Sequence, residues 1–119
     1  MRIFKTTWFS RFAQREAITD KSLKEVVRFV DAGRFDADLG GGVYKQRLSR
    51  PGGGKSGGYR LIVCLRQGER AFFVYGFPKS DKENIAPAEV KGFKKMAKML
   101  FAMTEEQLSC SKMFSEIKE

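Results

Sequence analysis

Histidine is absent from this chain of 119 residues, and cysteine is scarce, with only Cys64 and Cys110. The lack of histidine excludes reactions that use an imidazole as general acid or base. Two thiols without histidine are too few ligands for a structural zinc site, so we expect neither a metal nor another cofactor. We interpret both cysteines as reduced, small apolar residues and not as a disulfide or redox pair.

Long apolar runs are also missing. No segment approaches the roughly 20 apolar residues that a membrane-spanning helix needs. The opening segment MRIFKTTWFSRF lacks the apolar stretch and the small-residue cleavage site of a signal peptide. We therefore expect a cytoplasmic protein without a membrane partner. A hydrophobic content of 42% argues against disorder, and the length suits one core, so residues 1–119 are predicted to form a single domain.

Negative charge is scarce in the segment where positive charge is concentrated. The formal net charge is +9, and residues 43–82 hold nine cations against two anions. Those cations lie in short alternating segments joined by a glycine-rich loop, which indicates a sheet surface that binds a polyanion such as RNA or DNA. The nine cations are Lys45, Arg47, Arg50, Lys55, Arg60, Arg66, Arg70, Lys79 and Lys82.

The hydrophobic pattern predicts an α+β domain. Helical spacing follows Trp8 and continues from Thr19 to Gly33, whereas residues 34–42 have the composition of a loop. Period-two alternation predicts strands over 2–6, 43–48, 59–66 and 70–77, and helices are expected over 87–103 and from the capping box of Thr104 and Gln107. We expect a small, curved, mostly antiparallel sheet with N-terminal helices packed on one face, followed by C-terminal helices.

Gly54-Lys55-Ser56 is superficially similar to a phosphate-binding P-loop. The P-loop pattern requires a glycine where this sequence has Ser49, and its loop must lead into a helix, whereas this one leads into a strand. We therefore do not expect nucleotide hydrolysis. We interpret the segment as a basic loop that contacts an RNA backbone, the alternative being a hairpin connection whose lysine is simply solvated.

Arg60 is the most informative single residue, because its neighbours along the strand are apolar. Alternation places it on the face opposite Tyr59, and we expect that face to be open. A planar guanidinium in this position suits a bidentate clamp on a phosphate; the alternative is a structural salt bridge or a side chain that snorkels at the sheet edge. Lys45 and Arg47 share one face of the preceding strand, and Lys79 follows the third strand. Together these side chains are expected to line one basic groove.

Aromatic residues alternate with the cations. Most of them are expected in the core, but one or two could stack on exposed bases. The set is Tyr44, Tyr59, Phe73, Tyr75 and Phe77. A run of lysines over residues 91–98 is more typical of a solvated helix surface than of a second binding site.

Two stretches resemble the RelE/HigB superfamily, the toxins of bacterial type II toxin–antitoxin systems. They are G-G-Y-R-L-I-V and Q-G-E-R-A-F-F-V-Y-G-F-P-K-S-D-K-E-N-I, and R-P-G-G-G-K-S-G-G-Y-R is similar to a branch with a glycine-rich loop. The resemblance covers essentially the whole chain. It implies a small RNase that cuts mRNA in the ribosomal A site without metal. It also implies a tightly bound antitoxin, often a helix-turn-helix repressor.

The resemblance also implies roles for particular residues. Arg60 corresponds to the strand arginine that contacts the scissile phosphate. Lys45 and Arg47 correspond to a basic pair that stabilises charge and assists proton transfer. Lys79 corresponds to a basic segment after the last strand. The further residues that we predict to contact RNA are Arg50, Lys55, Tyr59, Tyr75 and Lys82. Two positions depart from the pattern: Ser80 replaces a second catalytic arginine of some relatives, and Ala86 aligns near their catalytic tyrosine.

Two classes of function follow from these observations. The first is a toxin that cleaves ribosome-bound mRNA and inhibits translation. The alternative is a non-catalytic relative, either a ParE-like toxin that binds DNA gyrase or a basic nucleic-acid-binding module without cleavage activity.

Overall fold

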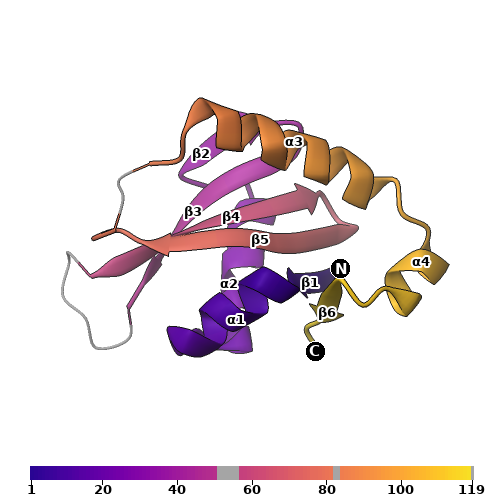
Figure 1. Cartoon of the computed structure of the whole chain (residues 1–119), viewed down its shortest axis with the longest axis horizontal. Coiled ribbons are helices and arrows are strands. Elements are labelled where there is room, and N and C mark those ends of the chain that lie inside the picture. Colours follow the sequence, from indigo (N-terminus) through magenta and orange to yellow (C-terminus); the bar gives the residue numbers. More distant parts are fainter. Residues whose placement is uncertain (51–56, 82–83, 119) are drawn as a thin grey trace.

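The computed structural model describes residues 1–50, 57–81 and 84–118, which form six strands and four helices (Figure 1). No helix in these three ranges is long and apolar enough to cross a membrane. The elements are, in order, β1 (Arg2–Thr6), α1 (Thr7–Arg15), α2 (Asp20–Asp31), β2 (Ala37–Gly40), β3 (Val43–Ser49), β4 (Gly58–Arg66), β5 (Arg70–Pro78), α3 (Pro87–Phe101), α4 (Glu105–Cys110) and β6 (Phe114–Glu116).

The strands form one sheet in the order β2-β3-β4-β5-β1-β6. Neighbours pair antiparallel, except that β1 runs parallel to β5. A sheet of this kind with helices segregated around it is the α+β class, which confirms the expected fold.

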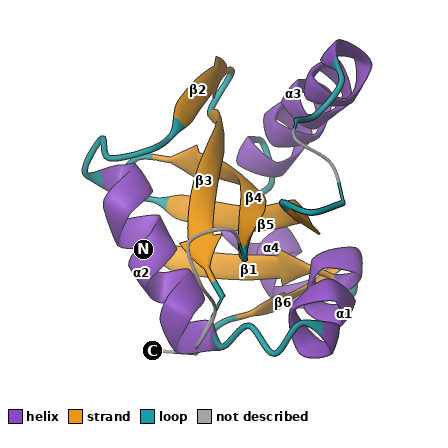
Figure 2. Ribbon diagram, turned by 90° about the vertical axis from the view of Figure 1, so that its left-hand side faces the viewer, coloured by secondary structure: helices purple, strands orange, loops and turns teal. Residues whose placement is uncertain are grey.

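Helices cover both faces of the sheet. Figure 1 shows α3 above the sheet and α1 and α2 below it, and Figure 2 shows α2 and α3 on opposite sides. The core on the α1/α2 side contains Leu61 and Val63 of β4, and the core on the α3/α4 side contains Ile62 and Cys64. The alternation along β4 therefore divides its side chains between two cores, as a strand buried on both faces requires.

Local capping explains where the helices begin and end. The hydroxyl of Thr19 accepts a hydrogen bond from the backbone N–H of Ser22 at the start of α2, and Gly33 beyond its end has a φ of +83°. At α4, Thr104 and Gln107 form the expected capping box. These interactions satisfy backbone groups that a helix end leaves unpaired, which confirms these predicted boundaries.

Two strands were not expected from the sequence. Residues 34–42 were predicted to be loop, but Ala37–Gly40 pairs with β3, and Gly40, Gly41 and Gly42 form the connecting turn with positive φ values. Phe114–Glu116 pairs with β1 at the opposite edge. Both are short edge strands, and their pairing depends on a distant partner more than on their own alternation.

The prediction that the Arg60 face of the sheet is open was wrong in part. Ile62 and Cys64, which share that face, are fully buried in the core that includes Ala97 and Leu100 of α3. Arg60 itself is only partly buried. The C-terminal helices thus cover the middle of this face, and the two ends of β4, at Arg60 and at Arg66, reach solvent.

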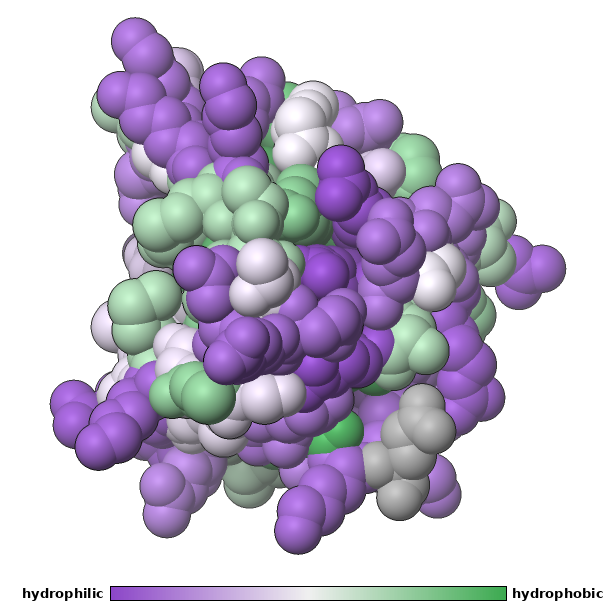
Figure 3. Space-filling view, turned by 90° about the vertical axis from the view of Figure 1, so that its right-hand side faces the viewer, coloured by the Kyte–Doolittle hydropathy of each residue, from purple (hydrophilic) through white to green (hydrophobic). Residues whose placement is uncertain are grey.

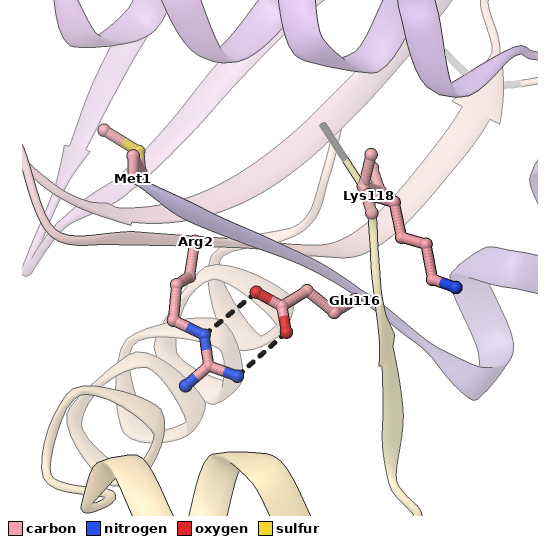
Figure 4. A pocket seen from close by; sticks show the side chains of 5 residues that line it. Met1, Arg2, Glu116 and Lys118 are labelled. Atoms are coloured by element: carbon pink, nitrogen blue, oxygen red, sulfur yellow. Dashed lines mark hydrogen bonds and ion pairs between the residues drawn. The ribbon is translucent and has the colours of Figure 1, made fainter.

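A paired cluster of charges holds the C-terminal segment against β1. Arg2 donates hydrogen bonds to both carboxylate oxygens of Glu116, at 2.9 and 2.8 Å, and to Glu105 at 2.6 Å. Figure 4 shows Arg2 facing Glu116 at the rim of an open hollow of about 480 Å³. The hydrogen bonds to Glu116 and Glu105 raise the pKa of Arg2, and the hydrogen bond from Arg2 lowers the pKa of Glu116. Because these charges neutralise one another, we assign this hollow a structural role.

The surface at this end of the molecule is mostly hydrophilic, with separate apolar patches between the polar regions (Figure 3). Met99 and Met113 are each about half exposed. Singly exposed apolar side chains of this kind are normal on soluble domains and need no ligand to explain them.

The two cysteines are expected to react very differently with a thiol reagent. Cys64 is completely buried, and burial raises its pKa to about 12, whereas Cys110 is exposed. The thiolate is the reactive form, so Ellman's reagent at pH 8 should modify one thiol in the native protein and two in guanidinium chloride. Cys110→Ser should leave no reactive thiol in the native protein. Rapid modification of two native thiols would contradict the burial of Cys64.

Candidate functional site

Two arginines face each other across the β3–β4 ladder. Arg47 is the direct partner of Arg60, and Lys45 is the partner of Ile62. Directly opposite residues in an antiparallel pair project from the same face, so Arg47, Arg60 and Lys45 share one side of the sheet. Like charges in this arrangement are destabilising, and an anion bound between them would relieve the repulsion.

Arg60 forms no hydrogen bond or ion pair with any residue that the structure describes. Its side chain is partly buried, and its partner on β5 is the buried ring of Phe77. Every fully buried side-chain nitrogen and oxygen in the described ranges has a hydrogen-bond partner, so the guanidinium nitrogens of Arg60 remain accessible to solvent. This result removes the structural salt bridge as an explanation for Arg60 within the described part of the chain.

The other two cations are held by single polar contacts. The Nε of Arg47 lies 3.2 Å from Oδ2 of Asp36, and the Arg47 side chain is 69% exposed. The Nζ of Lys45 donates to Oδ1 of Asn84 at 3.3 Å. These contacts restrict the two side chains but leave donor capacity for a ligand. Asp36 and Asn84 were not predicted from the sequence, because both lie in loops where no periodic pattern indicates a contact.

Lys79 lies at the same end of the sheet. It follows β5, and its backbone N–H donates to the carbonyl oxygen of Gly58 at 2.9 Å. This hydrogen bond continues the β4–β5 ladder by one step beyond the Tyr59–Pro78 pair. Lys79 is therefore a diagonal neighbour of Arg60, and its side chain is exposed.

Arg50 and Tyr59 belong to a different environment. Tyr59 is only 2% exposed, packs in the α1/α2 core, and donates its hydroxyl to Oε1 of Glu16 at 3.0 Å. Arg50 lies over the Tyr59 ring and donates to the Tyr59 hydroxyl at 3.3 Å. The ring of Tyr59 is enclosed on the face opposite Arg60, so the structure does not bring this predicted RNA contact together with Lys45, Arg47 and Arg60. Arg50 is exposed but is separated from Arg60 by the sheet.

Tyr75 is partly buried in a cluster of rings on the Arg60 side. Its ring centroid lies 4.8 Å from Trp8, 5.5 Å from Phe93 and 5.9 Å from Phe77. Tyr75 is paired with Ile62 across β4–β5 and therefore lies diagonally beside Arg60. The structure thus brings Lys45, Arg47, Arg60, Tyr75 and Lys79 to one end of one face. Lys55 and Lys82 lie outside the described residues.

The family model described as the RelE toxin of the RelE / RelB toxin–antitoxin system matches residues 1–119. The chain belongs to the RelE toxin family. It is a toxin of a toxin–antitoxin system, and its family implies a cognate antitoxin as partner. A search of curated proteins found no match.

In this RelE-family toxin, the two departures noted in the sequence lie just beyond β5. Ser80 is exposed, and its Oγ lies 3.4 Å from Oδ1 of Asp81. Ala86 is the residue that precedes α3, and its backbone N–H donates to Oε1 of Glu89 at 2.8 Å. Ser80 offers no cation and Ala86 no phenol, so the cations that the structure groups near Arg60 are those of β3 and β4 together with Lys79.

The lysines of α3 form a separate run of charge, although Lys91 and Lys94 line a pocket with Asn84, the hydrogen-bond partner of Lys45. Their side chains are exposed, and no ion pair involves them within the described ranges. A charged helix face of this kind is typical of a solvated surface. The four residues are Lys91, Lys94, Lys95 and Lys98.

Proposed function

We propose that this toxin is a metal-independent endoribonuclease that cleaves ribosome-bound mRNA and so inhibits translation. The observation that carries the proposal is Arg60, a partly buried arginine without a partner among the described residues and directly opposite Arg47. Two arginines directly opposite each other on one face suit a phosphate, which accepts bidentate hydrogen bonds from arginine.

The reaction that this site suits is attack by the ribose 2′-oxygen on the adjacent phosphorus. A bond forms between O2′ and phosphorus, and the bond between phosphorus and O5′ breaks. The products are a 2′,3′-cyclic phosphate and a free 5′-hydroxyl. The 2′-hydroxyl loses its proton, the leaving 5′-oxygen gains one, and no water or metal enters the balance.

Each cation has a distinct part in this proposal. Arg60 and Arg47 hold the non-bridging oxygens and stabilise the charge that develops in the transition state. Lys45 lies two residues from Arg47 on the same face, and its ammonium group donates the proton to the 5′-oxygen. Tyr75, the diagonal neighbour of Arg60, lies beside these cations, whereas Tyr59 is buried on the opposite face.

In this proposal the ribosome positions the mRNA. Holding a nucleotide in the geometry for in-line attack can supply a large part of the barrier reduction. This toxin has Ser80 and Ala86 where some relatives have an arginine and a tyrosine. It therefore depends more strongly on the positioning of the mRNA by the ribosome.

The chemistry of the cut ends tests the proposal. Inducible expression followed by primer extension on a reporter mRNA should show cuts in phase with the codons. Internal 2′-oxygen attack predicts 5′-hydroxyl ends, which resist a 5′-phosphate-dependent exonuclease until a polynucleotide kinase phosphorylates them. Cuts that carry 5′-phosphates would contradict the mechanism. Growth arrest with intact mRNA would contradict the nuclease and direct attention to another target, such as DNA gyrase.

A further inference from the structure

An exposed tryptophan lies at the outer end of the ring cluster beside Arg60. Trp8 is 46% exposed, and its ring stacks on Phe12 with centroids 5.5 Å apart and planes 12° apart. It also contacts Tyr75 at 4.8 Å. Phe12 is 2% exposed, so the stack runs from the core to the solvent and ends in the indole ring.

The edge of β5 explains why this ring is close to the cations. The β1–β5 ladder ends at the Lys5–Phe73 pair, and the chain then enters α1. Trp8, in the first turn of α1, therefore contacts β5 at Tyr75, beyond the end of the β1 ladder. Tyr75 is the diagonal neighbour of Arg60, at a typical Cα separation of about 7–8 Å. A nucleotide bound at Arg60 would thus have Trp8 within reach of an adjacent base.

The close packing of Gly76 keeps α1 in this position. A Cβ atom at Gly76 would lie 2.6 Å from the Phe12 ring and 3.0 Å from the Leu61 side chain. The α1 helix therefore lies directly against β5, and the Trp8–Tyr75 contact follows from this packing.

Another exposed aromatic residue shows what is particular about Trp8. Phe29 on α2 is 45% exposed, almost the same fraction, but it makes no ring contact within the described part of the chain. Trp8 instead packs on the rings of Phe12 and Tyr75 and is still 46% exposed. Its indole N–H, moreover, makes no hydrogen bond to a described residue. An exposed ring that packs on other rings and lies close to Arg60, which has no partner among the described residues, matches the combination that single-stranded RNA uses: bases stack on aromatic rings and phosphates bind to arginine.

We propose that Trp8 is the stacking platform for the base next to the phosphate held by Arg60. The inference rests on the proposed RNA-cleaving function and extends it to a base-binding subsite. Stacking tolerates any base because each has a π-face, but a purine offers the larger ring. Trp8 thereby fixes the sugar and phosphate relative to Arg60 and gives the toxin a preference for a purine at that position.

The single tryptophan of the chain makes the test direct, because Trp8 is the only source of indole fluorescence. The probes are 2′-O-methyl oligonucleotides of eight residues, whose blocked 2′-oxygens prevent cleavage: an adenylate, a uridylate and an abasic backbone. We expect the adenylate to quench Trp8 most strongly and to bind most tightly, followed by the uridylate. The abasic backbone should bind weakly through its phosphates and leave the fluorescence almost unchanged.

Variants separate stacking from phosphate binding, with labelled oligonucleotides and fluorescence anisotropy as the readout. Trp8→Ala should weaken adenylate binding about 5- to 150-fold, which is the range expected for loss of one stacked base. Binding of the abasic backbone should not change. Trp8→Phe should restore most of the affinity, and Phe29→Ala, the matched control, should bind as wild type does. Far-UV circular dichroism of each variant checks that α1 is retained.

The outcomes distinguish this inference from the function on which it rests. If Arg60→Ala weakens binding but Trp8→Ala does not, the stacking platform is wrong and the phosphate site stands. If the wild-type protein binds the adenylate and the abasic backbone equally, the platform is also wrong. If neither variant changes RNA binding, both the inference and the proposed RNA contact at Arg60 fail. Loss of antitoxin binding in Trp8→Ala with unchanged RNA binding would assign the ring to the antitoxin interface instead.

Discussion

Replacement of Arg60 by alanine is expected to abolish growth arrest and to lower mRNA cleavage about 10²- to 10³-fold, as loss of one preorganised charge-stabilising donor does. The guanidinium lies opposite Arg47 and has no partner in the described ranges, so its removal breaks no internal hydrogen bond or ion pair there. The protein should therefore stay folded, with an unchanged circular dichroism spectrum. Cleavage is measured by primer extension on a reporter mRNA, wild type beside variant.

Two further variants make this experiment specific. Arg66 is on the same strand and the same face but at the opposite end, where its Nη1 lies 3.4 Å from the carbonyl oxygen of Phe101. Arg66→Ala therefore removes the same charge from a position outside the site and should cut normally. Arg60→Lys keeps the charge but loses the bidentate geometry, so an intermediate rate is expected. Wild-type cleavage by folded Arg60→Ala, or equal loss in Arg66→Ala, would refute the assignment.

Replacement of Arg70 by methionine is expected to lower the free energy of unfolding by about 3 kcal/mol, near the upper end for hydrogen bonds to a charged group. Arg70 is 8% exposed, and its Nη1 donates to the carbonyl oxygens of Met103 at 2.7 Å and Leu100 at 3.4 Å. Its Nη2 pairs with Glu105 at 3.1 Å. The side chain thus satisfies carbonyls at the C-terminal end of α3 and connects α4 to the sheet.

Urea unfolding followed by circular dichroism measures this effect. Arg66→Met is the matched control, because Arg66 is the cross-strand partner of Arg70 but is 52% exposed. Its contacts are exposed and longer: a 3.6 Å ion pair with Glu69 and a 3.4 Å hydrogen bond to the carbonyl oxygen of Phe101. Its removal should change stability by less than about 0.5 kcal/mol. Similar destabilisation by both variants would show that charge, and not the buried carbonyl contacts, matters at this edge.

Much of the local structure could be predicted because its causes lie within a few residues. Alternation in the segment 59–66 placed Leu61 and Val63 on one side and Arg60 on the other, as observed. The same alternation placed Tyr59 on the face opposite Arg60, and its ring is buried there. The helix starts at Thr19 and Thr104 followed from side chains that cap the next turn. Such features need no information about distant parts of the chain.

The failures concern contacts between distant segments. The strand Ala37–Gly40 was taken for a loop, because its pairing with β3 and not its own pattern makes it a strand. The packing of α3 over Ile62 and Cys64 was not predicted either. Both faces of β4 are apolar near its middle, so the alternation alone does not indicate which face a helix covers. Asp36, Asn84 and Trp8 showed no signal in the sequence, because each meets the site from another element.

By itself, the sequence determined the α+β class, the face on which Arg60 projects and the concentration of cations in one segment, since periodicity and composition are local properties. Which of those cations meet was decided only by the tertiary structure. The β3–β4 register sets Arg47 opposite Arg60, the sheet separates Arg50 from both, and the end of β1 lets Trp8 approach Tyr75. Register and helix placement minimise the free energy of the whole core, so no single segment encodes them.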